Sequence, residues 1–145
     1  MYVINEGTLE MPENWQDETM NALIAQDNSG LNIVITRLTL PFATDREAFY
    51  QQTISQFRDN LKKYQENDYR VISLADEPAH LLDYRWQSPE GRIDQVAVMQ
   101  IRGNQLITFT LSSSKGMSAG QKERMLAYIL TFKPHAQDPI TENQR

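Results

Sequence analysis

The side chains that most often carry out chemistry in proteins are few in this chain and stand far apart. The sequence holds two histidines, His80 and His135, and no cysteine. His80 begins an expected strand and His135 lies near the end of the chain, so a histidine-based metal site or catalytic triad would lack its other members. Without cysteine there are no disulfides, thiolate metal sites or cysteine nucleophile. We therefore expect no metal site and no cofactor.

Acidic side chains are more numerous but do not form a catalytic pair. Asp17 and Glu18, Asp76 and Glu77, and Asp83 lie in expected loops or on strands. Acid–base chemistry by two carboxylates requires opposed environments, and no spacing here indicates them. We expect solvated turns at these positions.

One short segment matches a catalytic pattern by its letters alone. Residues 116–120 read GMSAG, which fits the G-x-S-x-G of a nucleophile elbow. That motif needs a strand before it, a helix after it, and then an acid followed by a histidine. Here His135 precedes Asp138, in the polar tail. The sequence therefore predicts that the protein is not an enzyme.

A glutamine within an apolar strand is the more informative polar residue. The stretch IDQVAVMQI, residues 93–101, is apolar on both faces and carries Gln95 on one of them. In water, one face of an antiparallel sheet is usually polar, which gives a clean alternation. The stretch 19–25 breaks the alternation in the same way, because Met20, Ala22 and Ile24 oppose Leu23 and Ala25. Either two helices cover both faces, or part of the second face meets another chain.

The composition fits a single domain. A chain of 145 residues with 40% hydrophobic content can bury a core without metal or disulfide. With 14 basic against 19 acidic residues and no basic stripe, nucleic acid is not an expected partner. The first residues show no secretory signal, and no segment has the roughly 20 apolar residues of a membrane-spanning helix. We expect a cytoplasmic protein that does not insert directly into a membrane.

Two helices and eight strands are expected. Thr44 as N-cap and Glu47 form a capping box that opens a helix to about Tyr64, with one apolar stripe facing the sheet. A second capping box, Ser118 and Gln121, opens the last helix. Alternating runs and turn signals predict strands, the last four as a meander, near residues 2–5, 8–11, 19–25, 31–38, 69–74, 80–87, 92–102 and 105–112. This order predicts an α+β fold, a single domain with an antiparallel β-sheet and two helices over residues 1–133, followed by a frayed polar tail, 134–145.

The sequence resembles the Eag chaperones of type VI secretion over residues 2–133. The segments that carry the resemblance are INEGTLEMPENWQDETMN, with Pro12, Trp15 and Asp17 in the family's pattern, then NIVITR, AFYQQTISQF, LLDYRWQ and DQVAVMQI. The resemblance implies a PsbP-like fold and a homodimer. It also implies binding to the N-terminal transmembrane segments of a PAAR- or Rhs-containing effector, which the chaperone keeps soluble in the cytoplasm and helps to load on the VgrG spike.

The resemblance also implies a groove for the client helices. Met20, Ala22 and Val34 match the family's apolar lining, and Gln56 and Gln95 match its two glutamines. Asn60 stands where relatives have a small apolar residue. Strand alternation adds Ile93 and Ala97. A glutamine amide offers two donors, which could bind a client's backbone carbonyls without reading its side chains. The alternative is a PsbP-like accessory or small-ligand-binding dimer whose second face closes on its own partner protomer, with no membrane-helix client.

Overall fold

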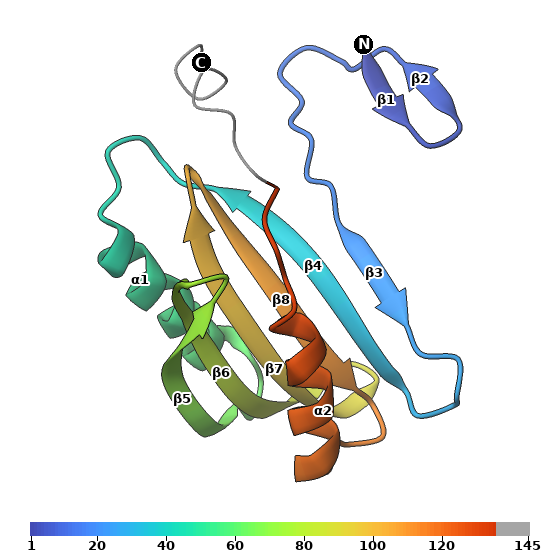
Figure 1. The fold of residues 1–145 in the computed structure, drawn as a ribbon, viewed down its shortest axis with the longest axis vertical. Helices are drawn as coiled ribbons and strands as arrows, with labels where there is room; N and C mark the ends of the chain where they lie inside the picture. The colour runs from blue at the N-terminus through green and yellow to red at the C-terminus, as the bar shows by residue number, and fades with distance from the viewer. Residues whose placement is uncertain (136–145) are drawn as a thin grey trace.

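The computed structural model describes residues 1–135 and contains a six-stranded antiparallel sheet, a small separate hairpin and two helices (Figure 1). The sheet has the strand order β3-β4-β8-β7-β6-β5. The elements are β1 (Tyr2–Ile4), β2 (Gly7–Leu9), β3 (Asn21–Ile24), β4 (Leu31–Thr39), α1 (Arg46–Asn60), β5 (Gln65–Leu74), β6 (Glu77–Ser88), β7 (Gly91–Arg102), β8 (Gln105–Ser113) and α2 (Ala119–Ile129).

Tight turns produce the meander of the last four strands. Pro89 and Glu90 join β6 to β7, and Gly103 and Asn104 join β7 to β8. Gly103 has a φ of 62°, a conformation that a hairpin turn requires and that glycine adopts at little cost. β4 then pairs with β8, and β3 forms one edge of the sheet. The predicted α+β fold with one antiparallel sheet and two helices is confirmed.

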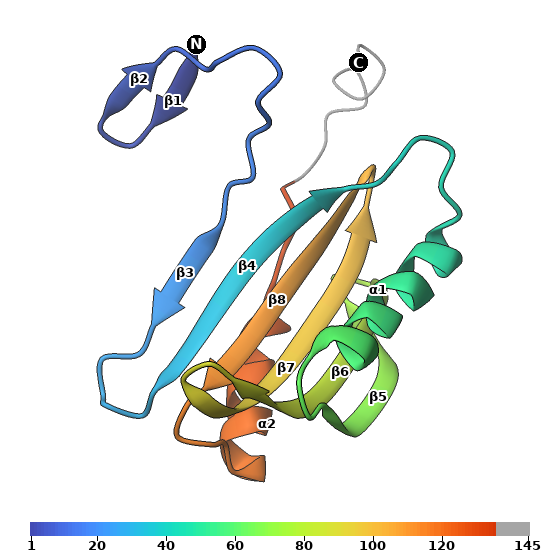
Figure 2. The same cartoon turned by 180° about the vertical axis from the view of Figure 1, so that it is seen from behind.

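Each helix covers a different face of the sheet (Figures 1 and 2). On the α2 face, Ile129 of α2 packs with the sheet residues Leu31, Ile33, Leu81, Val96, Val98, Phe109 and Leu111. On the α1 face, the helix buries Phe49, Tyr50 and Ile54 against Leu82, Tyr84, Ala97, Met99, Ile101 and Leu106. The core therefore consists of two layers, one on each side of the sheet.

This arrangement explains why β7 is apolar on both faces. Val96 and Val98 lie in the α2-side core, whereas Ala97 and Met99 lie in the α1-side core, and all four are at most 3% exposed. For the central part of this strand, covering by the chain's own two helices is the correct alternative. The strands at the β3 edge, by contrast, are not covered by a helix on the α1 face (Figure 2).

The predicted start and end of the first helix were both wrong. Asp45, not Thr44, is the N-cap, and its carboxylate accepts from the backbone N–H of Ala48. Thr44 instead donates its hydroxyl to the carbonyl of Pro41. Asp is at least as good an N-cap as Thr, and the capping-box spacing of Thr44 and Glu47 misled the prediction. The helix ends at Asn60, because Leu61 is already extended.

The second helix begins as predicted. Ser118 and Gln121 form the reciprocal capping box, with the Ser118 hydroxyl accepting from the Gln121 N–H at 3.1 Å. The predicted tail, 134–145, lies outside the described residues except for its first two. Among the described residues no helix combines the length and apolar character that a membrane crossing needs.

Candidate functional site

The α1 helix leaves part of its own face of the sheet uncovered. It lies over the β5–β6 side, whereas β4 and β8 have no helix in front of them (Figure 2). The strand register places eight side chains on this bare area, which we call the open surface: Ala22, Ile24, Asn32, Val34, Thr36, Leu38, Thr108 and Thr110. Ile24 is 74% exposed and Leu38 49% exposed.

The open surface carries no charge. Within the described chain, every side chain that β3, β4 and β8 present on this face is aliphatic, threonine, serine or asparagine. A sheet face that remains in water normally carries Lys, Glu, Asp or Arg, which are the residues most often exposed. Three adjacent strands without one are therefore typical of a face that another apolar group covers.

The two predicted glutamines lie beside this surface and close to each other. Gln56 of α1 and Gln95 of β7 line one hollow of about 310 Å³, at the junction of the helix and the open surface. Its remaining walls are Phe57, Leu61, Tyr84 and Thr110. This hollow thus has a wall formed by α1 and a floor formed by the strands.

Gln95 is held by its neighbours more firmly than predicted. Its Oε1 accepts from the indole Nε1 of Trp86 at 2.8 Å, and its Nε2 donates to the Ser112 hydroxyl at 2.9 Å. The expectation of two available donors was therefore wrong, because one N–H is already used within the chain. The second N–H of the amide makes no hydrogen bond within the described residues.

The other predicted groove residues divide into two groups. Ala22 and Val34 are directly paired on the open surface, and Met20, just before β3, is 62% exposed. Ile93 and Asn60 lie at the margins: Ile93 is half-buried and pairs with Trp86, and Asn60 is the exposed last residue of α1.

Ala97 is a correction to the predicted groove. It shares a face with Gln95, as strand alternation required, but it is 0% exposed and belongs to the core beneath α1. The helix packs directly over it. Ala97 therefore supports the groove from below and cannot contact a ligand.

The sequence interpretation missed several members of the site, including Trp86, Ser112 and Thr110. A signal for two of them was present. The two-residue turn at Gly103 and Asn104 fixes the register of β7 and β8, and counting back from it places Ser112 opposite Gln95 and Thr110 opposite Ala97. No comparable signal indicated the bond from Trp86, which reaches diagonally from β6.

The buried histidine makes contacts with the core. His80 is 4% exposed, its Nδ1 lies 2.7 Å from the Tyr69 hydroxyl, and its ring stacks on Tyr50 at 3.9 Å between centroids. Burial holds the pKa of His80 below its ordinary value. This histidine joins α1 to the sheet, so it is a core residue with its polar group satisfied.

Two of the acidic side chains form ion pairs within the chain. Asp83 accepts from the Lys122 ammonium at 3.0 Å, which ties α2 to β6. Glu77 pairs with Arg102 at 3.1 Å. Among the described residues no three His, Cys, Asp or Glu side chains form a group that could hold a metal ion.

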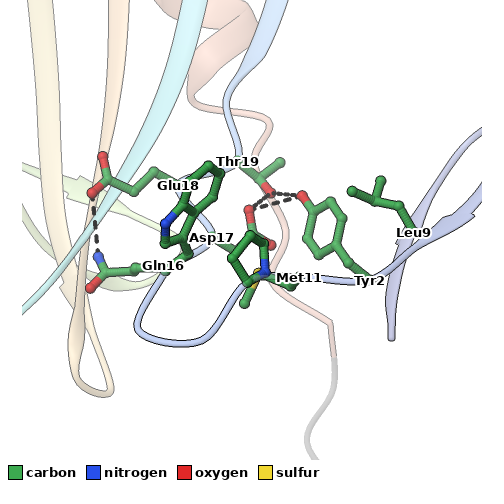
Figure 3. Close-up of a pocket in the computed structure, with 9 residues that line it drawn as sticks. Tyr2, Leu9, Met11, Gln16, Asp17, Glu18 and Thr19 are labelled. Carbon is green, nitrogen blue, oxygen red and sulfur yellow. Dashed lines mark hydrogen bonds between the residues drawn. The ribbon is translucent and has the colours of Figure 1, made fainter.

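An N-terminal arm, residues 1–20, stands apart from the sheet (Figure 1). Asp17 joins its hairpin to the segment that enters β3, since its carboxylate accepts from the Tyr2 hydroxyl at 3.0 Å and from Thr19 (Figure 3). The bonds from Thr19 and Tyr2 hold the pKa of Asp17 below its ordinary value. Apolar side chains on the arm are nonetheless exposed: Val3, Leu9, Met11 and Trp15.

One solved structure shares this architecture over nearly the whole chain. The crystal structure of PA94 from Pseudomonas aeruginosa, a protein of unknown function, has a TM-score of 0.75 and 19% identity and covers 94% of this chain and 96% of that one. The solution structure of cyanobacterial PsbP from Synechocystis sp. PCC 6803 has a TM-score of 0.46 and 11% identity, with 77% of each chain covered. No curated protein matches the sequence. The model of the DcrB family matches residues 6–131, so the chain belongs to the DcrB family.

Proposed function

We propose that this protein is a cytoplasmic Eag-type chaperone. Its client would be the N-terminal transmembrane region of a PAAR/Rhs-type type VI secretion effector, which it shields from water. This shielding would stabilise the effector and aid its loading on the secretion spike. The fold similarity to PA94 supports only the architecture, so the proposal depends on the site itself.

The uncharged open surface carries the proposal. A membrane-spanning helix is apolar around its circumference, so in water it needs a cover without charged groups. The open surface offers aliphatic and threonine side chains across three strands, beside a wall that carries Gln56. Glutamine amides can satisfy the backbone carbonyls that small residues expose on such a helix. A catalytic role has no comparable support.

One protomer covers only one side of a helix, so the proposal includes a homodimer. Two features support a contact between copies. β3 is a sheet edge whose residues are all exposed, and such an edge is open to pairing with another strand. The N-terminal arm leaves Trp15 70% exposed and Val3 69% exposed. An isolated two-stranded hairpin is only marginally stable in water, so the arm would gain stability from a further contact. A second copy would cover these side chains.

Co-expression with defined apolar helices tests the proposed function. The affinity-tagged chain would be produced with a soluble carrier protein fused to the N-terminal apolar region of a PAAR/Rhs effector. A matched carrier would have two Lys residues within each apolar segment. We expect the first carrier to be recovered with the chain and the second to be left behind.

Failure to recover the apolar carrier, or equal recovery of both carriers, would contradict the proposal. Light scattering of the free chain at micromolar concentration gives a second test, since a monomer would argue against two protomers enclosing the helix. A stable dimer that binds none of the apolar carriers would instead favour the accessory or small-ligand-binding alternative.

A further inference from the structure

The orientation of the Gln95 amide follows from the chemistry of its two neighbours. An indole N–H can only donate a hydrogen bond, so Trp86 must face the oxygen of the amide. The distance from Trp86 Nε1 to Gln95 Oε1 is 2.8 Å. The Ser112 hydroxyl, 2.9 Å from Nε2, can either accept or donate, so serine alone would tolerate both orientations of the amide. Trp86 is therefore the residue that decides between them.

The positions of these residues make the orientation firm. Gln95 lies on β7 between its partners Tyr84 on β6 and Ser112 on β8. Trp86, two residues beyond Tyr84 on the same face, packs against the α1-side core. Ser112 is 8% exposed. Backbone pairing on both sides thus fixes the two groups that bind the amide.

Gln56 differs in this respect. It is an exposed residue of α1 that lines the same hollow, and within the described chain its amide makes no side-chain hydrogen bond. It can therefore turn to donate or to accept. The hollow combines one fixed amide with one adjustable amide.

We propose that Trp86 is a positioning residue that presents Gln95 to the groove as a hydrogen-bond donor. This inference rests on the proposed function. The remaining N–H of Gln95 would recognise an acceptor on the client helix, and a backbone carbonyl exposed beside a small residue such as Gly or Ser is the acceptor that an apolar helix offers. The groove would then favour helices with a small residue at the level of Gln95 over helices of large side chains throughout.

A double-mutant cycle tests this role with a soluble carrier fused to one Leu/Ala helix that has a central glycine. Dissociation constants would be measured for wild type, Trp86→Phe, Gln95→Leu and the double variant. Removal of the indole N–H should weaken binding about three- to tenfold, the loss of about one net hydrogen bond. In the Gln95→Leu background Trp86→Phe should have no further effect. A merely structural tryptophan would weaken binding equally in both backgrounds, and that result would overturn the proposal.

A second variant keeps the test valid if Trp86→Phe folds poorly. In Gln95→Glu the carboxylate can still accept hydrogen bonds from Trp86 and from Ser112, so the melting temperature of the free chain should stay near that of wild type. The carboxylate has no N–H, however, and so cannot donate to the client. We expect binding at least as weak as that of Gln95→Leu, and wild-type binding would refute a donor role. If the wild-type chain does not bind the helix, the proposed function fails. If it binds but the double-mutant cycle shows no coupling between Trp86 and Gln95, only the proposed role of Trp86 fails.

Discussion

A single carboxylate on the open surface should abolish client binding without unfolding the protein. Ala22 is exposed on β3, the edge strand of the open surface, and lies opposite Val34. Leu23, the next residue, is 60% exposed on the other face of the same strand. Ala22→Asp and Leu23→Asp therefore form a matched pair that differs in the face that receives the charge. Neither should change the free energy of unfolding by more than about 1 kcal/mol, because both sites are at the surface.

The size of the effect on binding has an upper limit. In Ala22→Asp, a bound client helix would bury the new carboxylate. The carboxylate can then take up a proton, so the loss of binding energy cannot exceed the free energy of this protonation by much. At pH 7 protonation of an aspartate with a pKa of about 3.9 costs about 4 kcal/mol, close to a thousandfold in affinity. At pH 5 the cost falls to about 1.5 kcal/mol. The loss of binding should therefore be large at pH 7 and much smaller at pH 5.

Binding of a glycine-containing Leu/Ala helix fusion at both pH values measures this effect, with thermal melting of the free variants as the control. We expect Leu23→Asp to bind within a few-fold of wild type. Equal losses for the two variants would show that the strand edge, not the open surface, matters. Unchanged binding by a folded Ala22→Asp variant would refute the location of the groove.

Three further predictions concern stability and assembly. Burial lowers the pKa of His80 in the folded chain, so neutral His80 contributes its full stability above the unfolded pKa of about 6.5. That stability is lost as the pH falls from this value through the folded pKa. The free energies of unfolding from urea titrations at pH 7.5 and pH 5.5 should therefore differ less for His80→Gln than for wild type. Burial alone would raise the pKa of Asp94, but the hydrogen bonds from Arg85 and from the Met117 N–H have the larger effect and hold the pKa below its ordinary value. Asp94→Asn should therefore lower the free energy of unfolding by about 1–3 kcal/mol at pH 7 and by less below about pH 4. Deletion of residues 1–18 should shift the chain from dimer to monomer in light scattering, and an unchanged mass would place the contact elsewhere.

The sequence was sufficient for the features that depend on near neighbours. The turn residues Gly103 and Asn104 set where β7 and β8 meet, and the period of two along each strand set which side chains share a face. These local rules placed Gln95 and Ala97 on one face of the sheet. They also place Ser112 opposite Gln95, although that partner was not predicted.

Tertiary packing decided what each of those side chains can touch. Gln95 and Ala97 are two residues apart on one face, yet α1 seals Ala97 and leaves Gln95 half-buried at the edge of the hollow. The diagonal bond from Trp86 likewise depends on how β6 lies against β7. A periodic pattern shows that a face is apolar but not how far along it a helix extends, because that limit depends on contacts between segments distant in the chain.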